Sequence, residues 1–307
     1  MSADGALNPL SKDWGVMRLY AIALSLVFLA GAGPAAAQQW TTGGKLLLTG
    51  GVSSVEGSGG GGLASWATIT GGGAGPASLG ANVHVTGVVS QDYELRSAGV
   101  AVGLGDRFEL SYARHVFDTG ATGGKLGLGA GFAFEQDVVG AKLRLIGDAV
   151  YDQDTWLPQI AAGVQWKRND QGAIVRAVGG RDHEGVDVYL AATKILLNES
   201  LVLSGAARAT KANQLGLLGF GGDKDDDYSL QFEGSAGVLL NRRLLVGAEY
   251  RSKPDNLGFA KEDDWVDVFA AYAINKNLSV TAAYADLGDI ATFKDQRGLY
   301  LSIQAGF

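Results

Sequence analysis

The chain has 307 residues, with 47 Gly, 5 Pro and no Cys, and its formal net charge is -7. The scarcity of Pro excludes collagen, and a hydrophobic content of 47% argues against a disordered chain. Without Cys there are no disulfides, thiolate metal sites or cysteine nucleophiles. The isoelectric point of about 5.0 argues against nucleic acid as a partner, and a mean hydropathy of +0.09 is too low for a helical membrane protein.

The first segment predicts export. An apolar run over 19–30 follows Met17 and Arg18, and the small residues Ala35–Ala37 come shortly after it. This order of charge, apolar core and small residues is that of a secretory signal peptide, and the run is shorter than the ~20 residues that span a membrane as a helix. We expect cleavage after Ala37, so that 1–37 comprise upstream residues and the signal peptide.

The stretch 38–78 is rich in glycine and its role is ambiguous. It either adds a hairpin to the fold that follows or folds into its interior as a plug. Within it, Gly57–Gly62 lacks the Lys-Ser/Thr pair of a phosphate-binding loop, and we interpret it as a flexible turn.

From residue 79 to the C-terminus the side chains alternate with a period of two, which is typical of β-strands. In 228–240, for example, Tyr228, Leu230 and Phe232 alternate with Ser229 and Gln231. We expect strands at about 79–90, 94–104, 107–116, 125–134, 138–147, 157–167, 173–180, 186–195, 201–211, 228–240, 243–251, 265–274, 278–286 and 298–307.

The second face of these strands combines small residues with full charges, which favours a transmembrane barrel with a polar lumen over a soluble β-sandwich. The charges that we expect in the lumen, as candidates for ion selectivity, are Glu109, Lys142, Arg144, Arg176, Asp187, Arg208, Glu233, Glu249, Arg251 and Asp267. Lys167 belongs to the same face. Short turns at 105–106, 168–172, 197–200, 241–242 and 275–277 are interleaved with longer linkers at 117–125, 148–156, 212–227, 252–264 and 287–297. Outer-membrane barrels have this arrangement of short periplasmic turns and longer outer loops.

The fold class is therefore all-β, a transmembrane antiparallel β-barrel over 79–307 with about 14 strands. The range is 12–16, since 38–78 could add a hairpin and 125–134 could belong to a loop. The last strand ends on an aromatic residue, and Leu299, Leu301, Ile303 and Phe307 share one of its faces. This resembles the C-terminal signal that the barrel-assembly machinery reads in the outer membrane of Gram-negative bacteria.

The segments Gly43–Leu63 and Gly103–Gly120, together with the Phe-ended strand, resemble a proteobacterial domain-of-unknown-function family of predicted outer-membrane barrels. The resemblance spans the chain beyond the signal peptide. It implies the fold and an outer-membrane location, and it transfers no activity and no functional residue.

No motif predicts catalysis, a cofactor or a metal site. Asp223–Asp227 begins like a calcium loop, but Tyr228 and Gly234 stand where an EF-hand needs Gly and Glu. This acidic outer loop is either simply solvated or shares divalent cations with lipopolysaccharide. Ser111 and His115 are four residues apart on one strand, ~13 Å, too far for proton transfer. We interpret Tyr93, Tyr112, Trp156, Trp166, Tyr250, Trp265, Tyr272 and Tyr284 as aromatic residues at the membrane interface.

The leading functional hypothesis is a passive, porin-like channel for small solutes, with the lumen charges as its filter. The alternative is a non-conducting structural or surface-interaction barrel with a plugged lumen. A lipid-modifying enzyme comes third. The partners that we expect are outer-membrane lipid, lipopolysaccharide and the barrel-assembly machinery.

Overall fold

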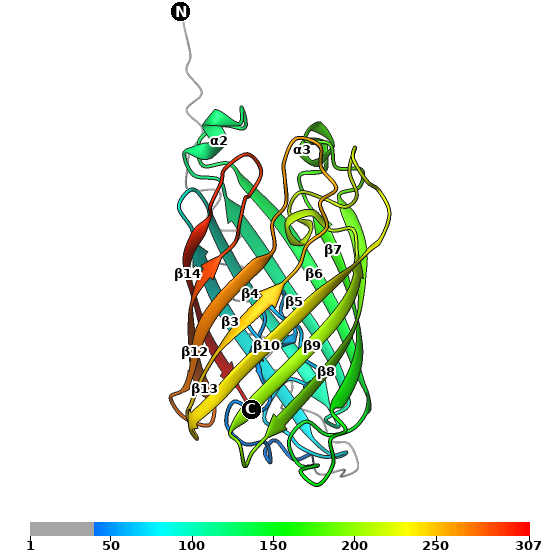
Figure 1. The fold of residues 1–307 in the computed structure, drawn as a ribbon, viewed down its shortest axis with the longest axis vertical. Coiled ribbons are helices and arrows are strands. Elements are labelled where there is room, and N and C mark those ends of the chain that lie inside the picture. The colour runs from blue at the N-terminus through cyan, green and yellow to red at the C-terminus, as the bar shows by residue number, and fades with distance from the viewer. Residues whose placement is uncertain (1–39) are drawn as a thin grey trace, which may run out of the picture. The chain divides into compact units, whose positions relative to one another are not determined.

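A computed structural model describes residues 40–307, so the expected signal peptide lies outside the described residues. This part of the chain forms a closed antiparallel barrel of twelve strands, each paired with its neighbour in sequence, and the last strand pairs with the first to close it (Figure 1). The barrel strands are β3 (Leu79–Val89), β4 (Glu94–Leu104), β5 (Phe108–Asp118), β6 (Ala133–Ile146), β7 (Gln159–Asn169), β8 (Glu184–Leu196), β9 (Leu201–Thr210), β10 (Ser229–Asn241), β11 (Leu244–Arg251), β12 (Trp265–Ala273), β13 (Leu278–Asp286) and β14 (Arg297–Gly306). The transmembrane β-barrel expected from the alternation is thus confirmed.

The strand count of twelve lies at the lower limit of the expected range, because two expected strands do not form. Residues 125–134 are mostly a connection, in which the helix α2 (Thr122–Lys125) comes first and β6 begins only at Ala133. Gly127, Gly129 and Gly131 in this connection have positive φ, so a short Gly–X repeat had the same period of two as a strand. Residues 173–180 contain the helix α3 (Gly172–Ala177) instead.

The two ends of the barrel differ in the length of their connections. At one end lie the tight turns after β4, β8, β10 and β12, together with both ends of the barrel sequence. At the other end lie the connections that carry α2, α3 and the 3-10 helix η2 (Asn213–Gly216), as Figure 1 shows. With the ends of the barrel sequence in the periplasm, the long connections face outward. Two connections differ from expectation, because 147–158 is a long periplasmic one and 168–172 is the start of the outer connection that contains α3.

The outer wall is apolar. Large side chains such as Leu230, Val268 and Leu299 point away from the lumen and are more than half exposed. The alternate positions on the same strands point inward, and many of them carry charges that are fully buried. Within residues 40–307, no helix is long and apolar enough to cross a membrane.

Candidate functional site: the lumen and the segment that fills it

The lumen is filled by the chain itself. Residues 40–78, which we call the lumen plug, start and end at the periplasmic rim, where 40–44 are exposed, and their middle part lies inside the barrel (the blue segment in Figure 1). The plug adds no strand to the barrel and contains only the short hairpin of β1 (Val52–Ser53) and β2 (Gly59–Gly60). All of residues 52–70 are buried. A barrel of twelve strands is wider than the eight-stranded barrels that side chains alone can fill, and here the plug occupies the extra space.

Glycine allows the plug to approach the wall closely. A Cβ atom on Gly61 of the plug would lie 1.6 Å from a carboxylate oxygen of Glu249 on β11. From the other side, a Cβ atom on Gly103 of β4 would lie 2.5 Å from the backbone oxygen of Thr70 in the plug. Part of the high glycine content therefore serves the contact between plug and barrel.

Glu56 is the central acidic residue of the plug. Its carboxylate pairs with Lys167 on β7 and, at 2.6 Å, with Arg251 on β11, and Arg208 on β9 lies 3.9 Å away. Burial alone would raise the pKa of Glu56, but the three cations outweigh it and hold this pKa well below its usual range. Glu56 is therefore an anion that ties the plug to widely separated strands of the wall.

Acidic residues of the wall complete this network around the same cations. Arg208 pairs with Glu233 at 2.6 Å and with Asp187 at 3.3 Å, and Asp187 also pairs with Lys167 at 2.6 Å. Glu233 in turn accepts a hydrogen bond from the backbone N–H of Ser65 in the plug, at 2.6 Å. These charges are satisfied by one another and by the plug, so they are not arranged along a free water path.

A second set of charged side chains, closer to the periplasmic end, forms hydrogen bonds with the plug backbone. Glu109 accepts hydrogen bonds from the backbone N–H groups of Gly59 (3.0 Å) and Thr70 (2.8 Å). Lys142, 3.3 Å from Glu109, donates to the backbone oxygens of Gly59 (2.6 Å) and Thr68 (2.7 Å). The pair thus satisfies donors and acceptors of a non-regular segment that would otherwise be buried unpaired.

Of the candidate lumen residues, all except Arg176 lie on the face that the alternation assigns to them, and Arg144 lies at the end of that face. Arg144 lies at the periplasmic rim, where it pairs with Asp106 (2.7 Å) and Asp148 (3.1 Å). Arg176 is exposed on α3 in an outer connection, so its assignment to the lumen was wrong. The cause is that Ile174, Val175 and Val178 have the spacing of a helix, which we interpreted as a strand.

Glu249 and Asp267 form a separate acidic pair. They are directly opposite each other in the register of β11 and β12, and both are buried. Glu249 accepts hydrogen bonds from the backbone N–H of Leu63 (2.7 Å) and the hydroxyl of Ser235 (2.5 Å). Among residues 40–307, no cation pairs with either carboxylate, and one oxygen of Asp267 has no hydrogen-bond partner.

The sequence analysis missed Glu56. A signal was present, since Glu56 is the only Asp, Glu, Lys or Arg between Lys45 and Asp92. A single charge in a long stretch of Gly, Ser and apolar residues is out of place unless it has a specific partner. The position of its partners could not be read from the sequence.

His115 binds the plug directly, and His84 binds it through Ser97. His115 donates from Nε2 to the backbone oxygen of Val55 at 2.8 Å, and the hydroxyl of Ser97 donates to the same oxygen at 2.7 Å. His84 lies 3.2 Å from the Ser97 oxygen, whose proton is already given to Val55, so this Nε2 donates to the hydroxyl. This Ser–His contact therefore does not have the arrangement of a base that activates a nucleophile.

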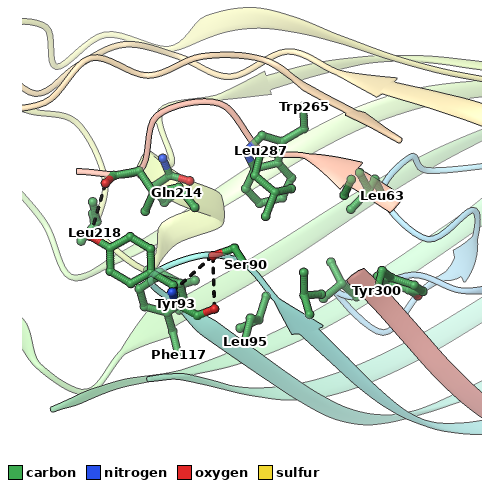
Figure 2. A pocket seen from close by; sticks show the side chains of 15 residues that line it. Leu63, Ser90, Tyr93, Leu95, Phe117, Gln214, Leu218, Trp265, Leu287 and Tyr300 are labelled. Carbon is green, nitrogen blue, oxygen red and sulfur yellow. Dashed lines mark hydrogen bonds between the residues drawn. The ribbon is translucent and has the colours of Figure 1, made fainter. Parts of the chain in front are cut away.

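Two aromatic residues expected at the membrane interface lie inside the barrel. Tyr93 and Trp265 are buried and line a cavity between the plug and the outer connections (Figure 2). Trp156, Tyr272 and Tyr284, in contrast, are exposed, as residues at a membrane interface should be.

At the C-terminus, Leu299, Leu301 and Ile303 point outward from β14 and are exposed, and Phe307 is half-buried. The backbone of Phe307 bonds to that of Ala81 at 3.0 Å and accepts from Gly72 of the plug at 3.1 Å. In the outer acidic loop, Asp226 pairs with Lys211 at 2.9 Å. Within the described part of the chain, no three His, Asp or Glu side chains are placed to hold a metal ion.

Solved outer-membrane barrels are similar to this chain at low sequence identity. The KdgM porin is 11% identical, with a TM-score of 0.47 and coverage of 74% of this chain and 99% of the porin. The COG4313 outer-membrane channel from Pseudomonas putida F1 is 14% identical (TM-score 0.43, 75% and 95% covered), and outer-membrane phospholipase A from Escherichia coli is 10% identical (0.41, 73% and 92%). At these values the likeness bears on neither substrate nor activity.

No curated protein matches the chain. The model of a family described as "Protein of unknown function (DUF3034)" matches residues 49–304, which is most of the sequence. This agrees with the resemblance to an uncharacterised family of outer-membrane barrels. The chain belongs to the DUF3034 family.

Proposed function

We propose that this protein resides in the outer membrane after removal of residues 1–37, as a barrel that its own N-terminal segment closes. In this state it is a non-conducting barrel with a structural or surface-interaction role. Of the two hypotheses from the sequence, the plugged barrel fits the geometry better than the passive channel.

The observation that carries this proposal is the position of Glu56. A passive pore needs lumen charges that face water, where they act on passing ions. Here Lys167, Arg208 and Arg251 are at most 4% exposed, and one carboxylate of the plug pairs with Lys167 and Arg251 and lies 3.9 Å from Arg208. Without the plug, these cations would lose the Glu56 carboxylate and keep only Asp187 and Glu233 of the wall as partners.

A catalytic role has little support, since the serine and histidine side chains that meet in the lumen are covered by the plug and bonded to it. The lipid-facing wall, where a lipid substrate would arrive, is made of apolar side chains. We therefore propose no enzymatic activity for this barrel.

The test is single-channel conductance of the refolded chain 38–307 in planar bilayers. We expect the native barrel to be silent, and Glu56→Arg to produce conducting steps because it places a fourth cation among Lys167, Arg208 and Arg251. Glu199→Arg is the matched control, since Glu199 is exposed in the turn between β8 and β9, and it should stay silent. Stable steps from the native barrel would overturn the proposal in favour of the passive channel.

A further inference from the structure

A pocket opens at the periplasmic rim of the barrel, beside the last part of the plug. It lies between the tight turn after β4, the end of β6 with the connection that follows, and Ala74–Pro76 of the plug. Its volume is about 450 Å³, and pockets that hold small ligands have volumes of ~300–1,000 Å³. The pocket is therefore large enough for a ligand of that kind.

The charged side chains at this pocket leave one positive charge uncompensated. Asp106 pairs with Arg144 at 2.7 Å and with Lys45 of the plug at 2.8 Å, and Asp148 pairs with Arg144 at 3.1 Å. These two cations and two anions balance one another. Arg107 also lines the pocket and is exposed, and no carboxylate of residues 40–307 pairs with it. The group as a whole is positively charged, so the pocket attracts an anion.

The two arginines are neighbours, and one of them is held in a fixed position. The backbone N–H of Arg144 donates to the backbone oxygen of Arg107 at 2.8 Å. The guanidinium of Arg144 donates to the carboxylates of Asp106 and Asp148, which fixes its orientation. A guanidinium has five N–H donors in a planar fork, a geometry that matches a phosphate group. Arg107 thus supplies a free guanidinium beside a second, preorganised positive charge.

The pocket continues into the lipid-facing wall. Leu145 and Ile146 line it, and they are 44% and 52% exposed at the end of β6. Two successive residues are exposed there because the pairing of β6 with β7 shifts its register between Arg144 and Ile146. A bulge of this kind changes the direction of side chains at the rim of a barrel. A ligand of this pocket can therefore contact charged groups and the apolar wall at the same time.

The connection after β6 carries aromatic side chains typical of a membrane interface. Trp156 is 85% exposed, and Tyr151, which lines the pocket, is 48% exposed. The hydroxyl of Tyr151 donates to the backbone oxygen of Gly44 in the plug. Tyr and Trp gather at the level of the lipid headgroups. The pocket therefore lies at the height of the headgroups of the periplasmic leaflet.

We infer that this pocket binds a glycerophospholipid of the periplasmic leaflet. Arg107 and Arg144 hold the lipid phosphate, and the acyl chains lie along Leu145 and Ile146. A soluble anion would use the two arginines but not the apolar side of the pocket. The inference deepens the proposed structural role by naming a lipid partner. It rests on that proposal for the orientation of the barrel, since the pocket faces this leaflet only when the long connections face outward.

The test is native mass spectrometry of the refolded barrel 38–307 in detergent, with added phosphatidylglycerol as the probe. Arg107→Gln removes the uncompensated charge and breaks no ion pair of residues 40–307. Arg242→Gln is the matched control, since Arg242 is exposed in the periplasmic turn between β10 and β11. For the apolar side, Leu145→Ser is compared with Leu240→Ser, because Leu240 is exposed at the periplasmic end of β10.

We expect one tightly bound phosphatidylglycerol per barrel in the native protein, in Arg242→Gln and in Leu240→Ser. Binding should be at least about 10-fold weaker in Arg107→Gln, because a charge-assisted contact with the phosphate is lost. Leu145→Ser should also weaken binding, since the acyl chains lose an apolar contact. Diacylglycerol, which lacks the phosphate, should bind equally to the native barrel and to Arg107→Gln.

Equal binding of phosphatidylglycerol to Arg107→Gln and to the native barrel would overturn the inference. It is also overturned if an excess of inorganic phosphate displaces the lipid and Leu145→Ser binds normally, because the pocket is then a site for a soluble anion. Conductance is measured on the same samples. A silent barrel that binds no lipid contradicts only the lipid site, whereas a conducting native barrel that binds the lipid contradicts only the proposed closure.

Discussion

Glu56 and Arg251 are 195 residues apart in the chain, and their side chains form a buried ion pair of 2.6 Å inside the barrel. The same carboxylate pairs with Lys167 on β7, several strands away around the wall. One residue of a segment that contributes nothing to the barrel sheet therefore connects separate parts of it. If the proposed closure of the lumen holds, the stability of the barrel and that closure should depend on the same contact.

Glu56→Gln should destabilise the barrel by about 3–5 kcal/mol, because it leaves Lys167 and Arg251 buried with less negative charge nearby. The measurement is the urea midpoint of unfolding of the refolded protein in detergent micelles. The double variant Glu56→Gln/Lys167→Met should recover part of this loss, since it removes one of the uncompensated cations. If Glu56→Gln unfolds at the native midpoint, the pairs of Glu56 contribute nothing to stability.

Acid should loosen the plug. The pKa of Glu56 in the folded protein is well below its usual value, because its three cations outweigh the effect of burial. A lowered pKa in the folded state gives stability that is complete above the unfolded-state pKa of ~4.3 and is lost as the pH falls below it. We expect the unfolding midpoint to fall between pH 5 and pH 3, with a smaller change in Glu56→Gln. The control is Glu199→Gln, whose pH dependence should match that of the native protein.

The alternation of side chains was sufficient to predict the barrel, because the membrane and the lumen impose opposite requirements on successive residues. The expected number of strands was too high, in part because one segment outside the sheet also alternates with a period of two. Gly127, Gly129 and Gly131 alternate with larger residues, but each has a positive φ and belongs to an outer connection. Only the three-dimensional course of the chain distinguishes this repeat from a strand.

The lumen charges could be assigned to a face from the sequence, but not to partners. The partners of Arg208 come from β8, β10 and the plug, so the register of two strand pairings and the course of the plug together decide whether they meet. The contacts of the plug are harder still to predict from the sequence. The plug has no periodic pattern, and its course follows the shape of the lumen that the barrel strands form. Glu56 was overlooked for that reason.

Asp267→Asn should leave stability unchanged or raise it. Asp267 lies opposite Glu249 with no cation beside it in the described chain, so neutralising it removes a repulsion between two buried carboxyl groups. Asp187→Asn is the matched comparison, because Asp187 is equally buried but pairs with Lys167 and Arg208. It should cost about 3 kcal/mol. Equal losses in the two variants, measured as thermal midpoints, would contradict this difference between the two aspartates.

Gly103→Ala should weaken the contact between plug and wall. The new methyl group would lie 2.5 Å from the backbone oxygen of Thr70 and 2.9 Å from a methyl group of Ile69, so the plug must move. Overpacking of this kind costs about 1–3 kcal/mol, which we expect in the urea midpoint.

Gly87→Ala is the matched control on the adjacent strand, because a Cβ atom there meets nothing within 4 Å. Both changes have the same effect on the conformational freedom of the unfolded chain, so the difference between them reports the contact with the plug alone. Gly103→Ala should also make the plug easier to cleave by an added protease, while Gly87→Ala should not. If the two variants have the same midpoint and the same cleavage rate, the plug does not contact β4 closely. That result would contradict the proposed closure of the lumen by the plug.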